Sequence, residues 1–308
     1  MSNKQIVYLV QGRKRNVVQY YYLQNNTSDL ITVTFDELVS EDELPSKKNI
    51  FFPDSTWAEG RNLQLSLVMS LEQKYLYYIF IDDDVEFERG TFAEFEKLLI
   101  LHKPAVAVPL LSIFKQTYRY DPNLTIQHPV GVDQQFQAYH RKVLDEGLVM
   151  PLITEYDKLS WFYSCEINNF MILRYYSGQV MQFNNIHVAN VGHGWDPLTN
   201  SSIYSKSKYV GGISREGLDL CRKWIEDRFG KQPEIVNSLF HRSNVPLLPD
   251  MPQGRWFIKQ LIKGLLEKQY KQVYEMIRLK IIYLYIFTRY FGYISNYKIN
   301  TKKVRPFF

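Results

Sequence analysis

The chain is poor in the residues that define several protein classes. Its two cysteines, Cys165 and Cys221, exclude a disulfide framework. Fifteen glycines and thirteen prolines in 308 residues are too few for a collagen-like or low-complexity chain. The N-terminal residues hold no apolar run long enough for a secretory signal, so we expect a cytoplasmic protein. The composition, 45% hydrophobic and 22% charged, indicates a globular chain. Its length of 308 residues allows one large domain or two smaller ones.

Positive charge is unevenly distributed along the chain. Residues 255–308 contain twelve Lys and Arg against Glu267 and Glu275, a net charge of +10, which leaves −5 for the rest of the chain. A basic, aromatic segment beside an acidic body predicts an anionic partner, either a membrane surface or a nucleic acid. We expect this partner to be the inner face of a membrane. Nucleic acid is not the expected partner, because the chain contains no recognised nucleic-acid-binding motif.

The basic segment has the apolar spacing of amphipathic helices. Its most apolar stretch, Ile281–Phe287, is much shorter than the roughly 20 residues that span a bilayer. Residues 251–308 are therefore predicted to form a helical appendage that lies in the membrane interface, with packing on the main domain as the alternative. Residues 1–250 are predicted to form the main domain.

The first 110 residues alternate between short apolar runs and helix-like stretches, which indicates an α/β fold with a mostly parallel sheet. A capping box at Thr56 and Glu59 marks a helix start. We also predict one or two strands over Trp161–Leu173. The other predicted strands are Ile6–Val10, Ile31–Phe35, Asn49–Phe52, Tyr77–Ile81 and Val106–Leu111, and the predicted helices cover about 16–24, 58–71 and 91–101.

Three consecutive carboxylates, Asp82, Asp83 and Asp84, follow the apolar run that ends at Ile81. Ligands of open α/β sheets bind outside the carboxyl ends of the strands, where these residues would lie. Adjacent carboxylates repel one another, and such a group attracts a cation such as Mg²⁺ or Mn²⁺. A solvated acidic turn that caps the next helix is the alternative.

This acidic motif, together with Glu59-Gly60-Arg61-Asn62 about twenty residues upstream, resembles the GT-A fold glycosyltransferases of bacterial polysaccharide synthesis. A third, weaker likeness is Cys165–Arg174, which is similar to the strand that lines their acceptor side. The resemblance implies a mixed sheet flanked by helices and a nucleotide-diphosphate sugar as donor. By this match Asp84 would bind Mn²⁺ or Mg²⁺ and Asp82 would support it near the ribose. Asp83 would complete the donor site, and Arg61 would face the nucleotide or its diphosphate.

Other residues are candidates for the nucleoside and for the acceptor, a saccharide or a lipid-linked sugar. Asp36, after the strand over 31–35, would either meet the nucleoside or cap a helix through Glu37. In the segment 192–196, glycines allow close approach of a ligand, Asp196 is the first candidate for the catalytic base, and His193 for a metal ligand or phosphate contact. Glu166 is the second candidate for the base.

Two other functional classes remain open. A sugar nucleotidyltransferase normally has a glycine-rich phosphate loop after its first strand, and here only Gly12 follows that strand. A non-catalytic membrane-binding or nucleic-acid-binding protein would use the basic segment and leave the acidic triplet without a role. The sequence therefore favours a metal-dependent glycosyltransferase.

Overall fold

The computed structural model describes most of the first 191 residues and a few positions beyond them. It describes 4–191 apart from 41–42, 44–48, 113–114, 116–119, 121, 130–131, 158–160 and 177–178, and then 195–196, 201–202, 220, 223–224, 227–228, 262, 266 and 270. The predicted boundary at residue 250 lies outside the described residues, as does the tail 251–308 apart from three positions.

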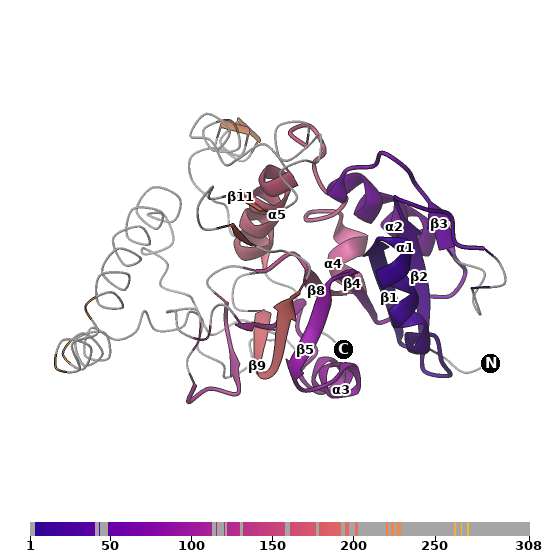
Figure 1. Cartoon of the computed structure of the whole chain (residues 1–308). Coiled ribbons are helices and arrows are strands. Elements are labelled where there is room, and N and C mark those ends of the chain that lie inside the picture. The colour runs from indigo at the N-terminus through magenta and orange to yellow at the C-terminus, as the bar shows by residue number, and fades with distance from the viewer. Residues whose placement is uncertain are drawn as a thin grey trace.

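One mixed sheet forms the centre of the molecule (Figure 1). Its strands are β1 (Ile6–Gly12), β2 (Ser28–Thr34), β3 (Asn49–Phe51), β4 (Tyr77–Asp82), β5 (Val85–Arg89), β6 (Val106–Leu111), β7 (Ile126–Gln127), β8 (Phe136–His140) and β9 (Val180–Asn190). The strand order is β3-β2-β1-β4-β8-β6-β9-β5, and β7 pairs with β9. Strands β5, β7 and β8 run against the other six. This topology confirms the predicted α/β class with a mixed, mostly parallel sheet.

Helices cover both faces of this sheet. They are α1 (Lys14–Val17), the 3₁₀ helix η1 (Val18–Leu23), α2 (Trp57–Ser70), α3 (Phe92–His102), α4 (Arg141–Glu146) and α5 (Trp161–Tyr175). A separate pair of short strands, β10 (Trp195–Asp196) and β11 (Ser201–Ser202), is antiparallel. Within the described residues, no helix is both long enough and apolar enough to cross a membrane.

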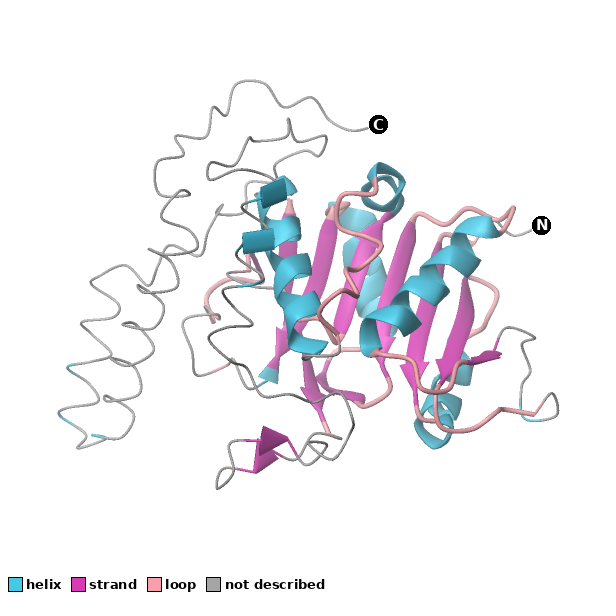
Figure 2. Cartoon of the chain, turned by 90° about the horizontal axis from the view of Figure 1, so that it is seen from above, coloured by secondary structure: helices cyan, strands magenta, loops and turns pink. Residues whose placement is uncertain are grey.

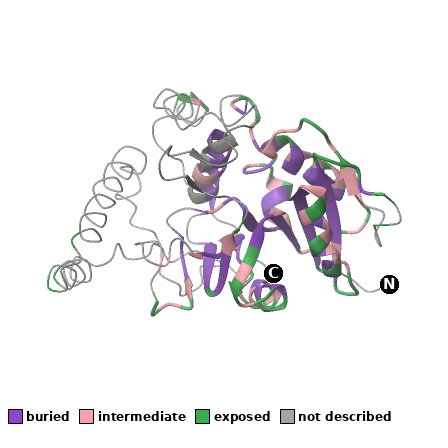
Figure 3. Ribbon diagram, in the orientation of Figure 1, coloured by how far each residue is buried: buried purple, intermediate pink, exposed green. Residues whose placement is uncertain are grey.

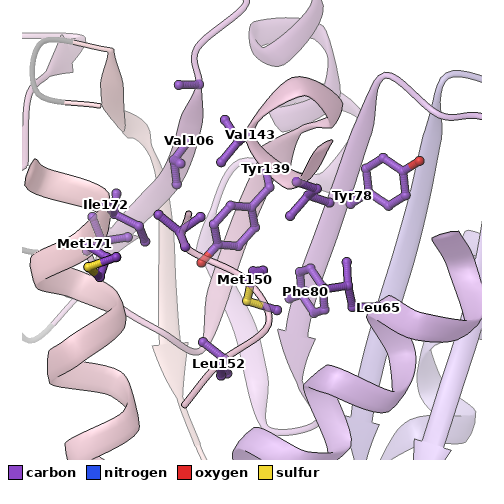
Figure 4. Packing of buried hydrophobic residues seen from close by; sticks show 14 of the residues in the cluster. Leu65, Tyr78, Phe80, Val106, Tyr139, Val143, Met150, Leu152, Met171 and Ile172 are labelled. Carbon is purple, nitrogen blue, oxygen red and sulfur yellow. The ribbon is translucent and has the colours of Figure 1, made fainter. Parts of the chain in front are cut away.

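Two hydrophobic cores lie on opposite faces of the sheet because successive strand residues point to opposite sides. Val7 and Leu9 of β1 pack with residues of α2, α4 and α5, and we call this side the α2 face. Tyr8 and Val10 pack with residues of α1, η1 and α3 on the other side, the α3 face. Figure 4 shows Phe80 in the core of the α2 face, and Figure 3 shows that the central strands are buried.

The predicted start of α2 is confirmed. The Thr56 hydroxyl accepts a hydrogen bond from the Glu59 backbone N–H at 3.2 Å, and the Glu59 carboxylate accepts one from the Thr56 N–H at 2.8 Å. This capping box fixes the first turn of α2 next to the carboxyl ends of β1 and β4. The five strands predicted in the first 111 residues also exist, with bounds shifted by up to three residues, as does the helix over 92–102.

The predicted strands over Trp161–Leu173 are wrong, because these residues form α5. Tyr163, Ile167 and Met171 recur every four residues and are all buried in the core of the α2 face. This helical spacing outweighs the local strand propensity of the aromatic residues. Glu166 therefore lies on a helix and not on a strand.

Candidate functional site

The carboxyl ends of β1 and β4 form the point at which the sheet topology reverses. From β1 the chain builds β2 and β3 on one side, and it then returns through α2 to place β4 on the other side. Gln11 lies directly opposite Asp82 in the parallel pairing of β1 with β4. Such a switch point is where open α/β sheets bind their ligands, so the predicted acidic motif lies at the expected edge. Figure 2 shows the arrows of these parallel strands ending along this edge.

Asp82, the last residue of β4, points to the α2 face. Its Oδ1 accepts hydrogen bonds from Arg61 Nη2 at 2.6 Å and from Trp57 Nε1 at 3.0 Å. Burial raises the pKa of the Asp82 carboxyl to about 6; the Arg61 charge opposes that shift and the Asp84 charge adds to it. The side chain is still 20% exposed, so Asp82 is held by protein donors and open to a ligand.

Arg61 is buried under this site, with only 1% of the residue exposed. Besides Asp82, its Nη2 donates to the backbone oxygen of Gln134 at 2.8 Å. The guanidinium carbon lies 4.6 Å from the centroid of the Trp57 ring and 5.4 Å from that of Phe80. Arg61 therefore contacts Asp82 and aromatic rings of the α2 face, and does not extend into the open edge of the sheet.

Asp83 fastens the loop that follows β1. Its Oδ2 accepts hydrogen bonds from the Arg13 backbone N–H at 2.8 Å and from Asn16 Nδ2 at 2.9 Å. A Cβ atom added at Gly12 would overlap the Asp83 side chain, so only glycine fits there. Burial raises the pKa of the Asp83 carboxyl, and hydrogen bonds from the loop oppose that shift. The side chain thus ties β1 to the turn after β4.

We call Asp82, Asp83 and Asp84 the acidic turn, and Asp84 connects it to the end of β9. Its residue is buried, and its backbone oxygen accepts a hydrogen bond from the Val191 N–H at 2.9 Å. Tyr20 supports the same turn from below, because its hydroxyl donates to the Val85 oxygen at 2.8 Å. Val191, which directly precedes the predicted acceptor segment 192–196, therefore lies beside the acidic turn.

The carboxylates differ in what they can offer a cation. Within the described residues, no group of three or more His, Cys, Asp and Glu side chains is arranged to hold a metal ion. One oxygen each of Asp82 and Asp83 is taken by protein donors. Mg²⁺, however, is commonly bound by one or two carboxylates together with substrate phosphates. The described residues therefore fit a cation shared with a phosphate ligand.

Asp36 follows β2 at the same edge and is exposed. Its Oδ1 accepts hydrogen bonds from the backbone N–H groups of Lys14 and Glu37, both at 2.9 Å. No helix begins here, since residues 35–40 form bends and irregular chain, and the capping alternative for Asp36 is wrong. The carboxylate instead joins the loop after β2 to the loop after β1.

The structure describes little of the predicted acceptor residues. His193 lies outside the described residues, as do the side chains of Asp196 and Glu166. The backbone of Asp196 belongs to β10, opposite Ser201 of β11. In Figure 2 this strand pair lies beyond the edge at which the parallel strands end.

Two contacts to α2 were not identified by sequence reasoning. Trp57 donates to Asp82, and Gln11 Nε2 donates to the Trp57 backbone oxygen at 3.1 Å. One signal was available for Trp57, because it precedes Arg61 by four residues and so lies on the same face of the helix. Gln11 offered no such signal, since its role depends on how β1 packs against α2.

No protein-family model and no curated protein matches the chain. Several solved structures resemble it at low identity. A197 from STIV is 12% identical, with a TM-score of 0.38 over 68% of this chain and 98% of that chain. S. aureus TarS 1-349 in complex with UDP-GlcNAc is 11% identical, with a TM-score of 0.41 over 73% and 67% of the two chains. S. aureus TarS is 10% identical, with a TM-score of 0.45 over 74% of this chain and 40% of that chain.

Proposed function

We propose that the protein is a metal-dependent glycosyltransferase that moves a sugar from a nucleotide-diphosphate donor to a saccharide or lipid-linked acceptor. The observation that carries this proposal is the position of Asp82, Asp83 and Asp84 at the topological switch point between β1 and β4. A nucleotide bound there would meet the loops after β1 and β2, with the acidic turn beside its diphosphate.

The three carboxylates have different roles in this proposal. Asp82, oriented by Arg61, accepts a hydrogen bond from the donor ribose. Asp84 binds Mg²⁺ or Mn²⁺, which neutralises charge on the departing diphosphate when bound. Asp83 contributes to the donor site by holding the loop after β1, since its Oδ2 is taken by Arg13 and Asn16. Asp36 holds the same loop from the other side and faces the nucleoside.

Asp196 is the proposed base that removes the proton of the acceptor hydroxyl, with His193 as a metal or phosphate contact and Glu166 as the second candidate for the base. The hydrogen bond from the Val191 N–H to the Asp84 backbone oxygen supports this assignment, because Val191, the residue before the segment 192–196, lies beside the acidic turn. A base positioned at the acceptor contributes on the order of 10²-fold or more in rate. We expect Asp196→Asn to lose that factor and Glu166→Gln to remain active, and the reverse result would exchange their roles.

Calorimetry with nucleotide sugars, including the UDP-GlcNAc bound in one TarS structure, tests the donor site in Mg²⁺, in Mn²⁺ and in excess chelator. We expect binding and slow hydrolysis to a nucleoside diphosphate that require the metal. Asp84→Ala should abolish both. Asp145→Ala, the same change at an exposed position of helix α4, is the matched control and should change neither. Unchanged hydrolysis by Asp84→Ala, or consumption of a nucleoside triphosphate with a sugar phosphate, would overturn the proposal.

The basic segment is proposed to dock the enzyme on the inner, anionic face of a membrane, where a lipid-linked acceptor would be presented. Three described residues support this: Ile262, Leu266 and Tyr270 are spaced by four in helical conformation and are 51%, 78% and 63% exposed. Each nearby Lys or Arg adds about 1 kcal/mol of attraction to an anionic surface. Sedimentation with anionic and neutral vesicles tests this, and equal binding to both, or binding only to nucleic acid, contradicts it.

A further inference from the structure

Three side chains from two elements make a closed set of contacts under the acidic turn. Trp57 and Arg61 are one turn apart on α2, and both donate to the same oxygen of Asp82, at 3.0 Å and 2.6 Å. The Arg61 guanidinium also lies over the Trp57 ring, 4.6 Å from its centroid, within the range of a cation–π contact. Each member of the set therefore touches the other two.

Two donors on one oxygen fix the orientation of the Asp82 carboxylate. The terminal torsion of an aspartate is soft and nearly two-fold, so one donor alone would let either oxygen accept the bond. Arg61 donates from beneath, where it is 1% exposed, and Trp57 donates from the partly exposed first residue of α2. With Oδ1 held from two directions, Oδ2 has a defined direction in which to meet a ligand.

The first turn of α2 is held in place by several contacts, so the Trp57 indole N–H has a fixed position as a donor. Gln11 of β1 donates to the Trp57 backbone oxygen at 3.1 Å. A Cβ atom at Gly60 would come within 2.7 Å of Gln11 Oε1, so a larger residue there would displace the Gln11 side chain. The hydroxyl of the capping residue Thr56 also donates to the buried Asp157. Groups held on rigid elements orient a ligand better than groups on free loops.

We propose that Trp57 is a positioning residue of the nucleotide site, which acts by orienting Asp82 toward the ribose. The inference rests on the proposed function, because it names a residue of the same donor site. Trp57→Phe keeps an aromatic ring over Arg61 and removes only the indole N–H. The hydrogen bond also exists in the free protein, so its full contribution sets an upper limit, and nucleotide binding should weaken by up to about tenfold.

A double-mutant cycle with Asp82→Ala separates positioning from a general structural role. If Trp57 acts through Asp82, Trp57→Phe weakens binding of a nucleoside diphosphate in the wild-type background and has no further effect in the Asp82→Ala background. Trp224→Phe is the matched control, since this tryptophan packs against the same core and lines a surface pocket with Glu155 and Tyr156, and it should leave binding unchanged. Equal losses in both backgrounds would overturn the inference.

The ¹⁵N spectrum of the free protein supplies a readout that requires no ligand. Trp57→Phe removes one indole N–H signal and so assigns it, and Asp82→Ala should then shift that signal. An indole signal that does not respond to Asp82→Ala overturns the inference. If the wild type binds no nucleotide, the proposed function fails and the role of Trp57 in it fails with it. If the wild type binds and Trp57→Phe binds equally well, only the role of Trp57 fails.

Discussion

The helices on the two faces of the sheet bury different kinds of side chain. On the α3 face, Phe95 of α3 packs against the rings of Phe136 and Phe183, with centroids 4.8 Å and 5.4 Å apart. On the α2 side, α2 also buries polar side chains: Arg61 is 1% exposed and Gln64 is 0% exposed. Within the described residues, Arg61 Nε and Nη1 and both amide atoms of Gln64 have no hydrogen-bond partner.

This difference separates helix α3, which stabilises the fold, from helix α2, which also serves the site. Aromatic side chains contribute strongly to stability when they are buried. A polar atom that is buried without a partner costs about 1–3 kcal/mol in proteins. Both faces therefore stabilise the fold through their hydrophobic cores, and helix α2 loses part of that stability by placing Arg61 and Trp57 beneath Asp82. Substitutions in the core of the α3 face should change the free energy of unfolding, and substitutions beneath Asp82 should change nucleotide affinity.

The largest expected effect on stability is that of Phe95→Ala. Removal of a buried phenyl ring should lower the free energy of unfolding by about 3–5 kcal/mol, because a cavity remains between Phe136 and Phe183. Nucleotide affinity measured well below the unfolding transition should not change. Leu101→Ala, on the same helix but with a residue that is 67% exposed, is the control and should stay within about 0.5 kcal/mol. A loss of nucleotide affinity in the folded Phe95→Ala protein would show that the core of the α3 face also controls binding.

The next effect is on the pH dependence of stability, and it has opposite signs on the two faces. His140 lies beside Tyr77 of the α3 face, with ring centroids 5.3 Å apart, and burial lowers the pKa of its imidazole to about 4. In the unfolded chain a histidine has a pKa near 6.5, so protonation favours unfolding. Between about pH 6.5 and pH 4 the protein should lose roughly 3 kcal/mol of stability from this residue alone.

Asp82 should act in the opposite sense on the α2 face. Its folded pKa of about 6 lies above the unfolded value of about 3.9, so its contribution to stability decreases as the pH rises through this range. Unfolding free energies between pH 4 and pH 7 test both residues. His140→Asn, which keeps a residue able to cap α4, should remove the loss of stability at low pH, and Asp82→Asn should make that loss steeper. Identical slopes in the variants and the wild type would contradict the assignments.

The sequence predicts the part of the fold that depends on local pattern. The run Tyr77–Ile81 is apolar or aromatic throughout, as expected for a strand buried on both faces, and Thr56 and Glu59 have the spacing of a capping box. Strand β8 was missed because Gln137 and His140 interrupt its apolar pattern, although both are buried. A buried polar residue in a strand depends on tertiary partners, and no local signal reveals them.

The candidate site was predictable in its position but not in its contacts. The acidic triplet follows a strand, and this alone places it at the carboxyl edge of the sheet. The contact of Asp83 with Arg13 joins residues 70 positions apart and exists only because β1 and β4 are neighbours. Likewise, Arg61 was expected to face the ligand, whereas the packing of α2 on the sheet directs it beneath Asp82.

The smallest expected effect is that of Tyr20→Phe, which tests whether the two faces are joined through the acidic turn. Tyr20 belongs to the core of the α3 face, yet its hydroxyl donates to the Val85 oxygen at 2.8 Å, directly after the acidic triplet. The variant keeps the ring and leaves that buried oxygen without this donor, so unfolding should become easier by about 1–2 kcal/mol.

Denaturant unfolding and nucleotide titration of Tyr20→Phe decide between two kinds of coupling. Tyr22→Phe, whose residue is 64% exposed, is the matched control and should change neither quantity. If Tyr20 only stabilises the turn, affinity stays within a fewfold range of the wild type while stability decreases. If the free energy of nucleotide binding weakens by much more than the free energy of unfolding decreases, the hydroxyl also sets the position of the carboxylates. The α3 face then takes part in binding. The second result would show that the two faces do not act separately, because a residue in the core of the α3 face would then control the geometry of the site.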